Sequence, residues 1–307
     1  MGSGDWLKRL DYGLLLPAAG NLPLPLAQKM ANLRGWIHYF VNRDSRKHAI
    51  QNVASVFPDL SEQEVRRIVV GHYQTPSRDE VEAFWYPESL DRLSRFTSIS
   101  GFELLREAAH SGAGVLLFSG HLGSTGLFFS FLGKSGVPMN IVGRSIDPEE
   151  NPLHPSEWAF NRKRVRWIEE AVENPFLLTG KGNYSRMLQK LNAGEVLMLL
   201  VDVVPSFTKH HVPVQFFGST ARFADGIASL FRESEARLFH YIIRWDPDTG
   251  SHFIELIELT DSVSRSASSQ VIMQTLISII EERIRRYPAH WWCWDSLTHY
   301  YSEEELL

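Results

Sequence analysis

Short apolar runs alternate with amphipathic stretches along most of the chain. Residues 115–118 and 196–201 are apolar throughout and flanked by turn residues, which predicts strands buried on both faces. Apolar residues at helical spacing predict helices over residues 62–75, 101–110, 122–133, 184–191 and 270–286. This alternation predicts an α/β fold with a mainly parallel mixed sheet flanked by helices.

Turn and capping residues place several element boundaries. The strand candidates 237–245 and 252–259 are separated by Asp246-Pro-Asp-Thr-Gly250, a plausible hairpin connection. Residues 139–142 form another strand candidate. Ser61 and Glu64 have the spacing of a capping box, which starts a helix by satisfying its first free amides.

The N-terminal region is apolar and aromatic but cannot form one long spanning helix. Residues 10–41 are interrupted by Pro17, Pro23 and Pro25, and the chain has no run of 18 apolar residues. We expect a helical, membrane-proximal subdomain over residues 1–75, packed on an α/β domain over residues 76–307 as one structural unit. Its apolar residues either lie on a bilayer interface, beside basic neighbours, or cover the core; they are Trp6, Leu7, Leu10, Leu14, Trp36, Tyr39 and Phe40.

The composition of the chain narrows the classes of protein to which it can belong. The 307 residues carry 31 basic and 36 acidic side chains, a net charge of −5, which disfavours a general nucleic-acid binder. The single cysteine, Cys293, excludes an internal disulfide framework and a cysteine-rich metal site. His210 and His211 have no suitably spaced partner ligand, so we expect no metal. A reducing, cytoplasmic location fits this cysteine usage.

The segment around His121 is the strongest candidate for chemistry. It reads as a buried strand, a turn and a helix start, and ligands of open α/β sheets bind at the carboxyl ends of strands. Gly120, Gly123 and Gly126 permit close approach to the backbone, and free amides at the helix start could bind an oxyanion. His121 is then either a general base or a buried, hydrogen-bonded histidine.

Several further segments match a known family in order. They are Asn52 with Phe57-Pro58 and Ser61, Gly101-Phe-Glu, Gly120-His121, Gly143-Arg144, Asn192-Ala-Gly194-Glu195, residues 212–221 around Phe216-Phe217-Gly218, and Pro288-Ala-His-Trp291. With these segments the chain resembles the bacterial lipid A late acyltransferases, the lauroyl and myristoyl transferases of the lysophospholipid acyltransferase superfamily. The resemblance covers residues 30–295 and implies a glycerolipid-acyltransferase-like fold.

The resemblance implies a definite reaction. Such enzymes move an acyl group from a carrier-protein or coenzyme A thioester to a hydroxyl of a membrane lipid, with no metal or other cofactor and no obligatory acyl-enzyme. A histidine deprotonates the acceptor, an acid after four intervening residues orients the imidazole, and basic side chains bind phosphate or sugar. The implied location is peripheral, on the cytoplasmic face of a bacterial inner membrane.

The chain departs from the family pattern at the acid, because Gly126 follows the four residues after His121. Three explanations are open. Asp202, at the end of the next buried strand, supplies the acid; a hydroxyl of Ser124 or Thr125, or a backbone carbonyl, orients the ring; or the protein is a weakened or inactive relative that binds lipid or a carrier protein.

Glycine at position 126 also suggests an altered substrate. It is expected to enlarge the pocket for a bulkier or amine acceptor, including acyl or aminoacyl transfer to a soluble secondary-metabolite intermediate. Arg144 is expected to bind a phosphate or a carrier's phosphopantetheine arm, and Lys181 to lie on a loop over the pocket. The predicted substrate-binding set is Arg144, Ser124, Thr125, Gly126, Phe217 and Lys181, with His121 and Asp202 as catalytic residues.

Overall fold

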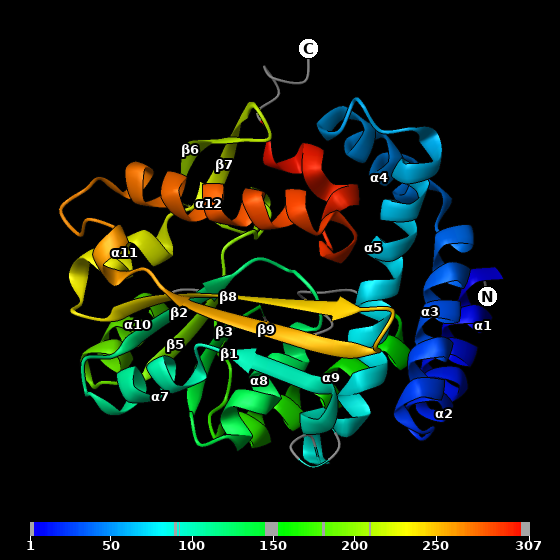
Figure 1. Cartoon of the computed structure of the whole chain (residues 1–307), viewed down its shortest axis with the longest axis horizontal. Coiled ribbons are helices and arrows are strands. Elements are labelled where there is room, and N and C mark those ends of the chain that lie inside the picture. Colours follow the sequence, from blue (N-terminus) through cyan, green and yellow to red (C-terminus); the bar gives the residue numbers. More distant parts are fainter. Residues whose placement is uncertain are drawn as a thin grey trace.

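The computed structural model describes residues 3–88, 91, 93–144, 153–179, 182–208 and 210–301. Within that part of the chain, a seven-stranded sheet has the order β1-β9-β8-β2-β5-β3-β4 (Figure 1). The strands are β1 (Thr97–Ser100), β2 (Val115–Ser119), β3 (Met139–Gly143), β4 (Leu177–Leu178), β5 (Val196–Leu200), β8 (Arg237–Asp246) and β9 (Ser251–Glu258). Strands β8, β2, β5, β3 and β4 run parallel, whereas β9 is antiparallel to β8. The predicted mainly parallel mixed sheet is confirmed.

Helices cover both faces of this sheet. The N-terminal helices are α1 (Ser3–Leu10), α2 (Leu16–Gly20), α3 (Leu24–Val41), α4 (Arg43–Val56) and α5 (Glu62–Glu82). The remaining α-helices are α7 (Phe102–His110), α8 (Thr125–Lys134), α9 (Pro155–Val172), α10 (Asn183–Asn192), α11 (Gly226–Glu233) and α12 (Ser269–Arg286). A separate antiparallel hairpin consists of β6 (His211–Phe216) and β7 (Ser219–Ala224).

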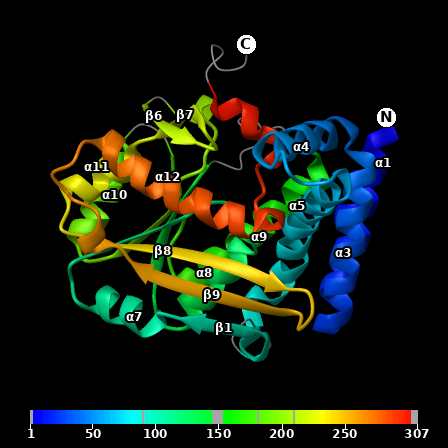
Figure 2. The ribbon, with the colours of Figure 1, turned by 45° about the horizontal axis from the view of Figure 1, so that its top comes forward.

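The alternation of side chains along the strands divides the core into two layers. In β2, Leu116 and Phe118 belong to the cluster under α12, whereas Val115 and Leu117 belong to the cluster that contains α8 and α9 residues. All five residues of β2 are buried. Figure 2 shows α12 lying across one face of the sheet while α8 lies on the other. A strand covered on both faces explains the continuous apolar run in the sequence.

Most predicted elements agree with the structure, with two informative differences. Helix α5 begins at the predicted Ser61 capping box but continues past residue 75, across Pro76, to Glu82. Its last turns are buried and carry Arg78, Asp79 and Glu82, polar residues that gave no helical pattern of apolar positions. Helix α8 begins at Thr125 rather than at residue 122, because residues 120–124 form the turn after β2.

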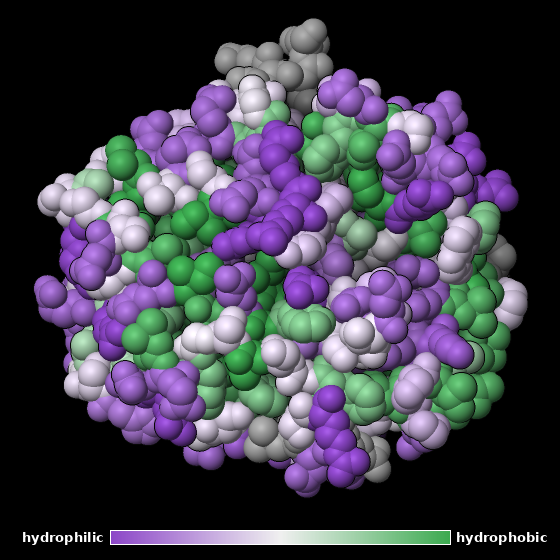
Figure 3. All heavy atoms as spheres, in the orientation of Figure 1, coloured by the Kyte–Doolittle hydropathy of each residue, from purple (hydrophilic) through white to green (hydrophobic). Residues whose placement is uncertain are grey.

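The apolar N-terminal residues divide between the core and the surface. Small residues such as Ala27 and Ala31 are fully buried, and they belong to α3, which packs along α5. Large side chains face outward instead: Trp6, Leu14 and Phe40 are 58%, 59% and 58% exposed. Figure 3 shows hydrophobic surface at the right-hand edge of the molecule, where Figure 1 places these helices.

None of the helices in the described ranges is both long and apolar enough to cross a membrane.

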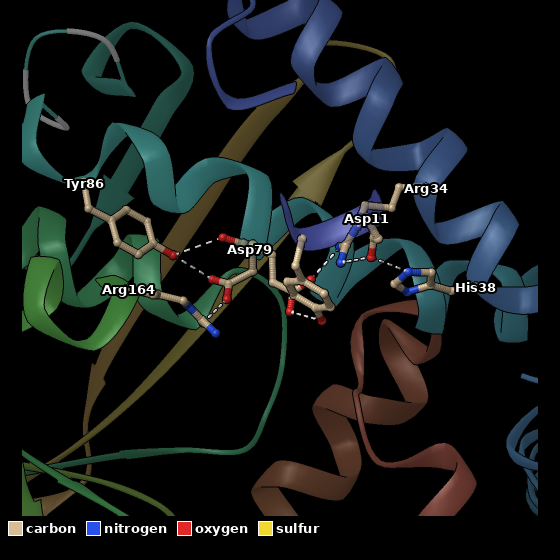
Figure 4. A network of polar contacts seen from close by, with 8 residues as sticks. Asp11, Arg34, His38, Asp79, Tyr86 and Arg164 are labelled. Carbon is tan, nitrogen blue, oxygen red and sulfur yellow. Dashed lines mark hydrogen bonds and ion pairs between the residues drawn. The ribbon is translucent and has the colours of Figure 1, made fainter. Parts of the chain in front are cut away.

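Buried ion pairs join the N-terminal helices to α5 (Figure 4). Arg34 of α3 pairs with Asp11 and Glu80, and His38 also contacts Asp11. Burial acts to raise the pKa of Asp11, but the hydrogen bonds from His38 and Arg34 prevail and lower it to about 2. This lowered pKa stabilises the fold at pH values above the ordinary aspartate range, and the stabilisation is lost as the pH falls towards 2.

Close contact between α8 and α9 requires a glycine at position 133. A Cβ at Gly133 would lie 2.2 Å from the carbonyl oxygen of Ala171. We predict that Gly133→Ala lowers the free energy of unfolding by about 1–3 kcal/mol, as overpacking does. Gly13→Ala is the control, because a Cβ there meets nothing within 4 Å. Equal denaturation midpoints for the two variants would contradict the prediction.

Candidate active site

The register of two parallel strands brings His121 and Asp202 together. Strands β2 and β5 are paired from Val115 with Val196 to Ser119 with Leu200. His121 and Asp202 each lie two residues beyond that last pair, at the same edge of the sheet. Nδ1 of His121 is 2.7 Å from Oδ1 of Asp202. The predicted placement of Asp202 beside His121 is therefore observed, although it was inferred only from strand order.

Four further features hold the Asp202 carboxylate in place. Oδ2 accepts hydrogen bonds from the His121 backbone amide and from Nε1 of Trp291, both at 2.8 Å. The hydroxyl of Tyr300 donates to the Asp202 carbonyl oxygen at 2.6 Å. A Cβ at Gly120 would lie 2.9 Å from Oδ2, so glycine at that position lets the carboxylate approach the turn. The side chain of Asp202 is fully buried, whereas that of His121 is 30% exposed.

The two groups shift each other's pKa. Burial alone would lower the pKa of His121, but the charge and hydrogen bond of Asp202 raise it well above the ordinary value of 6.5. Burial alone would raise the pKa of Asp202, but His121 and Trp291 lower it. The carboxylate is therefore ionised and accepts the Nδ1 proton, which leaves Nε2 as the basic nitrogen when the ring is neutral.

A large apolar cavity adjoins the pair. Its volume is about 960 Å³, at the upper end of small-molecule sites. His121, Asp202 and Arg144 all line it. Most of its wall is apolar and comes from the ends of β3 and β5, from α10 and α11, and from residues 203–208; it includes Phe129, Ile141, Phe176, Met187, Phe207 and Leu230. Such a wall suits a long hydrocarbon chain rather than a polar metabolite.

Arg144 is the predicted phosphate ligand that the structure places at this cavity. It directly follows β3, its side chain is exposed, and its guanidinium lies 3.6 Å from the ring centre of Phe207. Stacking on an aromatic ring uses a face of the guanidinium and not its N–H groups, whose geometry suits an anion.

Residues 122–126 do not line the cavity, so the expectation that Gly126 enlarges it was wrong. A Cβ at Gly126 would lie 2.3 Å from the Tyr86 hydroxyl oxygen, and the Gly126 amide donates to Asp79 at 3.0 Å. Ser124 and Thr125 are also buried outside the cavity wall. Figure 4 shows Tyr86 and Arg164 converging on Asp79. Position 126 therefore packs against Asp79 of α5 and against Tyr86, outside the cavity wall.

Most backbone amides at the predicted oxyanion site, at the start of α8, are bonded within the protein. The amides of Leu122, Gly123 and Thr125 donate to backbone carbonyls. The His121 and Gly126 amides donate to Asp202 and Asp79. The glycines of this turn allow close packing of other parts of the protein: Asp202 lies against Gly120, Ile243 against Gly123 and Tyr86 against Gly126.

One further predicted substrate ligand, Phe217, is not brought to the site. Phe217 stacks on Trp294 with ring centres 5.7 Å apart and does not line the cavity. Its left-handed backbone, with φ of 52°, belongs to the turn between β6 and β7. Lys181 lies outside the described residues.

Sequence reasoning missed the contribution of residues 291–300. Trp291 and Tyr300 bond Asp202, and Cys293 lines the cavity beside His121. Trp291 and Trp294 are fully buried and belong to the core. The only available signal for Cys293 was its chemistry as the single thiol of the chain.

His121, Asp202 and Cys293 offer ligand atoms within 4.8 Å of one another, a spacing that a metal ion could bridge. Their hydrogen bonds argue for another use. Oδ1 of Asp202 already faces Nδ1 of His121, and Oδ2 accepts two N–H groups. Both oxygens of this carboxylate are therefore already engaged by N–H donors of the protein.

Sheet, cavity and paired side chains together define an α/β protein with a large apolar cavity beside a histidine–aspartate pair. The family model described as bacterial lipid A biosynthesis acyltransferase matches residues 6–294. Over 249 residues the chain is 27% identical to the "Lipid A biosynthesis lauroyltransferase" of Escherichia coli (strain K12). The aligned region covers 79% of this chain and 75% of that protein. The chain belongs to the bacterial lipid A biosynthesis acyltransferase family and is an acyltransferase, as its motifs indicated.

The packing of Gly126 gives a direct test of the site geometry. We predict that Gly126→Ala destabilises the fold by about 1–3 kcal/mol because its Cβ meets the Tyr86 ring and hydroxyl. Tyr86→Phe removes the nearest atom, so the double variant should recover part of that loss in a double-mutant cycle of unfolding free energies. Strict additivity of the two substitutions would show that this contact does not constrain position 126.

Proposed function

We propose that this protein transfers an acyl group from a carrier-protein or coenzyme A thioester to a hydroxyl or amine of a lipid-like acceptor, with His121 as general base. The observation that carries this proposal is the short contact between the His121 imidazole and the buried Asp202 carboxylate at the wall of an apolar cavity. The family and the E. coli relative support a lipid A-like acceptor.

The proposed chemistry follows from the orientation of the ring. With Nδ1–H bonded to Asp202, Nε2 accepts the proton of the acceptor as its oxygen or nitrogen attacks the thioester carbonyl. Asp202 stabilises the imidazolium that forms, and it supplies the orienting acid that position 126 lacks. The donor's thiol leaves with the proton. The cavity wall holds the acyl chain, and Arg144 binds a phosphate of the acceptor or of the donor's phosphopantetheine arm.

A catalytic pair explains the geometry better than the alternative of an inactive binding module. A protein that only binds lipid or a carrier has no need of a fully buried carboxylate directed at a histidine. Desolvating a carboxylate costs free energy that the surrounding N–H donors must offset.

Two substitutions test the catalytic pair. We predict that His121→Ala and Asp202→Asn each lower kcat/KM for thioester consumption by a factor on the order of 10²–10⁴. Because Asp202 favours the imidazolium, the acidic limb of the wild-type pH profile should lie above the ordinary histidine pKa of 6.5, and Asp202→Asn should move it to lower pH. Unchanged rates in His121→Ala would contradict the catalytic role and favour a binding module.

We also propose that the exposed aromatic residues of α3 bind a membrane surface peripherally. Trp36 and Phe40 stack with ring centres 5.4 Å apart and are 43% and 58% exposed. Paired aromatic side chains of this kind insert at a bilayer interface.

Vesicle binding tests this surface. We predict that replacing both Trp36 and Phe40 with serine weakens co-sedimentation with anionic vesicles by tenfold or more, given about 1.5–3 kcal/mol per buried aromatic side chain. Val271→Ser is a matched control, because Val271 is 56% exposed on α12. A wild-type protein that stays in the supernatant would instead favour a soluble acceptor, such as a secondary-metabolite intermediate.

A further inference from the structure

The indole of Trp291 donates its N–H to the Asp202 oxygen that faces away from the imidazole ring. Nε1 of Trp291 lies 2.8 Å from Oδ2, whereas Oδ1 lies 2.7 Å from Nδ1 of His121. The buried carboxylate therefore divides its partners, because Oδ1 meets the ring while Oδ2 meets the indole and the His121 amide. Donors on Oδ2 withdraw negative charge from the carboxylate that Oδ1 presents to the imidazole.

Packing holds the Trp291 ring in this position. The side chain is fully buried, and it meets the Trp294 ring edge to face with ring centres 4.8 Å apart. The backbone of Trp291 forms an isolated antiparallel bridge with Leu122, in the turn that carries His121. The indole N–H is therefore fixed relative to the Asp202 carboxylate before any substrate binds, as a preorganised donor must be.

The Asp202 carboxylate has two opposed effects on a general base. Burial acts to lower the pKa of His121, but the charge and hydrogen bond of Asp202 raise it well above the ordinary value of 6.5. The carboxylate thus orients the ring, yet it also favours the imidazolium, which cannot accept a proton. A donor on Oδ2 is bound most strongly when no imidazolium compensates the carboxylate, so the Trp291 bond favours the neutral ring.

Other titratable groups also face the pair. Burial raises the pKa of Cys293, of Tyr300 in the same segment and of Tyr241 on β8, so these three are uncharged near neutral pH. Further titratable groups line the adjoining cavity: Arg144, His210 and Asp225. All of these groups stay in place when Trp291 alone is replaced. A change in the ionisation of His121 on that replacement therefore reports the indole.

We propose that Trp291 is a positioning residue for acyl transfer, and that its bond to Oδ2 of Asp202 keeps His121 available as a base at neutral pH. This inference rests on the proposed function. The indole limits how strongly Asp202 holds the imidazolium, so the ring can take the acceptor's proton and then release it to the departing thiol. Trp291 does not line the cavity, and it acts on the reaction only through the carboxylate.

Replacing Trp291 with phenylalanine tests the bond, because the change removes the indole N–H and keeps an aromatic ring. We expect Trp291→Phe to move the acidic limb of the kcat/KM profile for thioester consumption to higher pH by about one unit, which is about a tenfold loss of activity below the limb. The plateau above the limb should be retained. Asp202→Asn moves the same limb in the opposite direction.

Trp294→Phe is the matched control. Trp294 is fully buried in the same aromatic cluster, but its Nε1 donates to the Pro288 carbonyl at 2.7 Å and not to Asp202. The control removes the same atoms from the core, and we expect its acidic limb to stay at the wild-type position. A limb that stays in place in Trp291→Phe, that moves to lower pH, or that moves equally in both variants would overturn the inference.

Titration of the His121 ring gives a readout that needs no acyl donor. In protein labelled with ¹⁵N-histidine, the ring signals are assigned by their loss in His121→Gln. We expect the titration midpoint of His121 to be about one pH unit higher in Trp291→Phe than in wild type. Where the thermal midpoint shows that Trp291→Phe does not fold, 3-benzothienylalanine at position 291 replaces the N–H with sulfur in a ring of similar shape, and the same change is expected.

The two readouts separate this inference from the proposed function. Equal His121 midpoints in wild type and Trp291→Phe would overturn the inference even where acyl transfer is observed. A wild-type protein that consumes neither dodecanoyl-coenzyme A nor a dodecanoyl carrier protein would overturn the proposed function. A raised midpoint in Trp291→Phe would in that case still support the action of the indole on the pair.

Discussion

The contact between His121 and the buried Asp202 carboxylate is the interaction around which this edge of the sheet is built. A carboxylate removed from water costs several kcal/mol unless nearby donors replace its hydration. Here the imidazole, a backbone amide and the Trp291 indole take that place. Satisfying one charge therefore fixes the turn after β2, the end of β5 and the segment after α12 relative to one another.

A second buried carboxylate holds the other end of the same turn. Asp79 of α5 accepts the Gly126 amide and the Tyr86 hydroxyl, and it pairs with Arg164 of α9. The segment from His121 to Gly126 is thus anchored at both ends by carboxylates from different elements. This arrangement ties the N-terminal helices to the site, because α5 also pairs with α3 through Glu80 and Arg34.

The sequence was sufficient for strands β2, β3, β5, β8 and β9, for the helical N-terminal region and for the central pair. Strands β1 and β4, the β6–β7 hairpin and helices α9 and α11 gave no signal that was recognised. Fully apolar runs located β2 and β5, and the rule that parallel strands end at one edge brought Asp202 to His121. The cavity wall could not be predicted, because α10, α11 and the strand ends are far apart in the chain and meet only after folding. Gly126 and Phe217 were misplaced for a related reason: a residue next to a motif in sequence faces whatever packs there, and here that is Tyr86 and Trp294.

The position of Asp79 gives a physical reason for the missing acid at 126. A glutamate or aspartate there would begin in contact with the Tyr86 hydroxyl and place a second negative charge near the fully buried Asp79. Two carboxylates in such a site cannot both stay ionised at low cost. Moving the acid to the end of β5 avoids that repulsion, and sheet register then sets its distance from the imidazole.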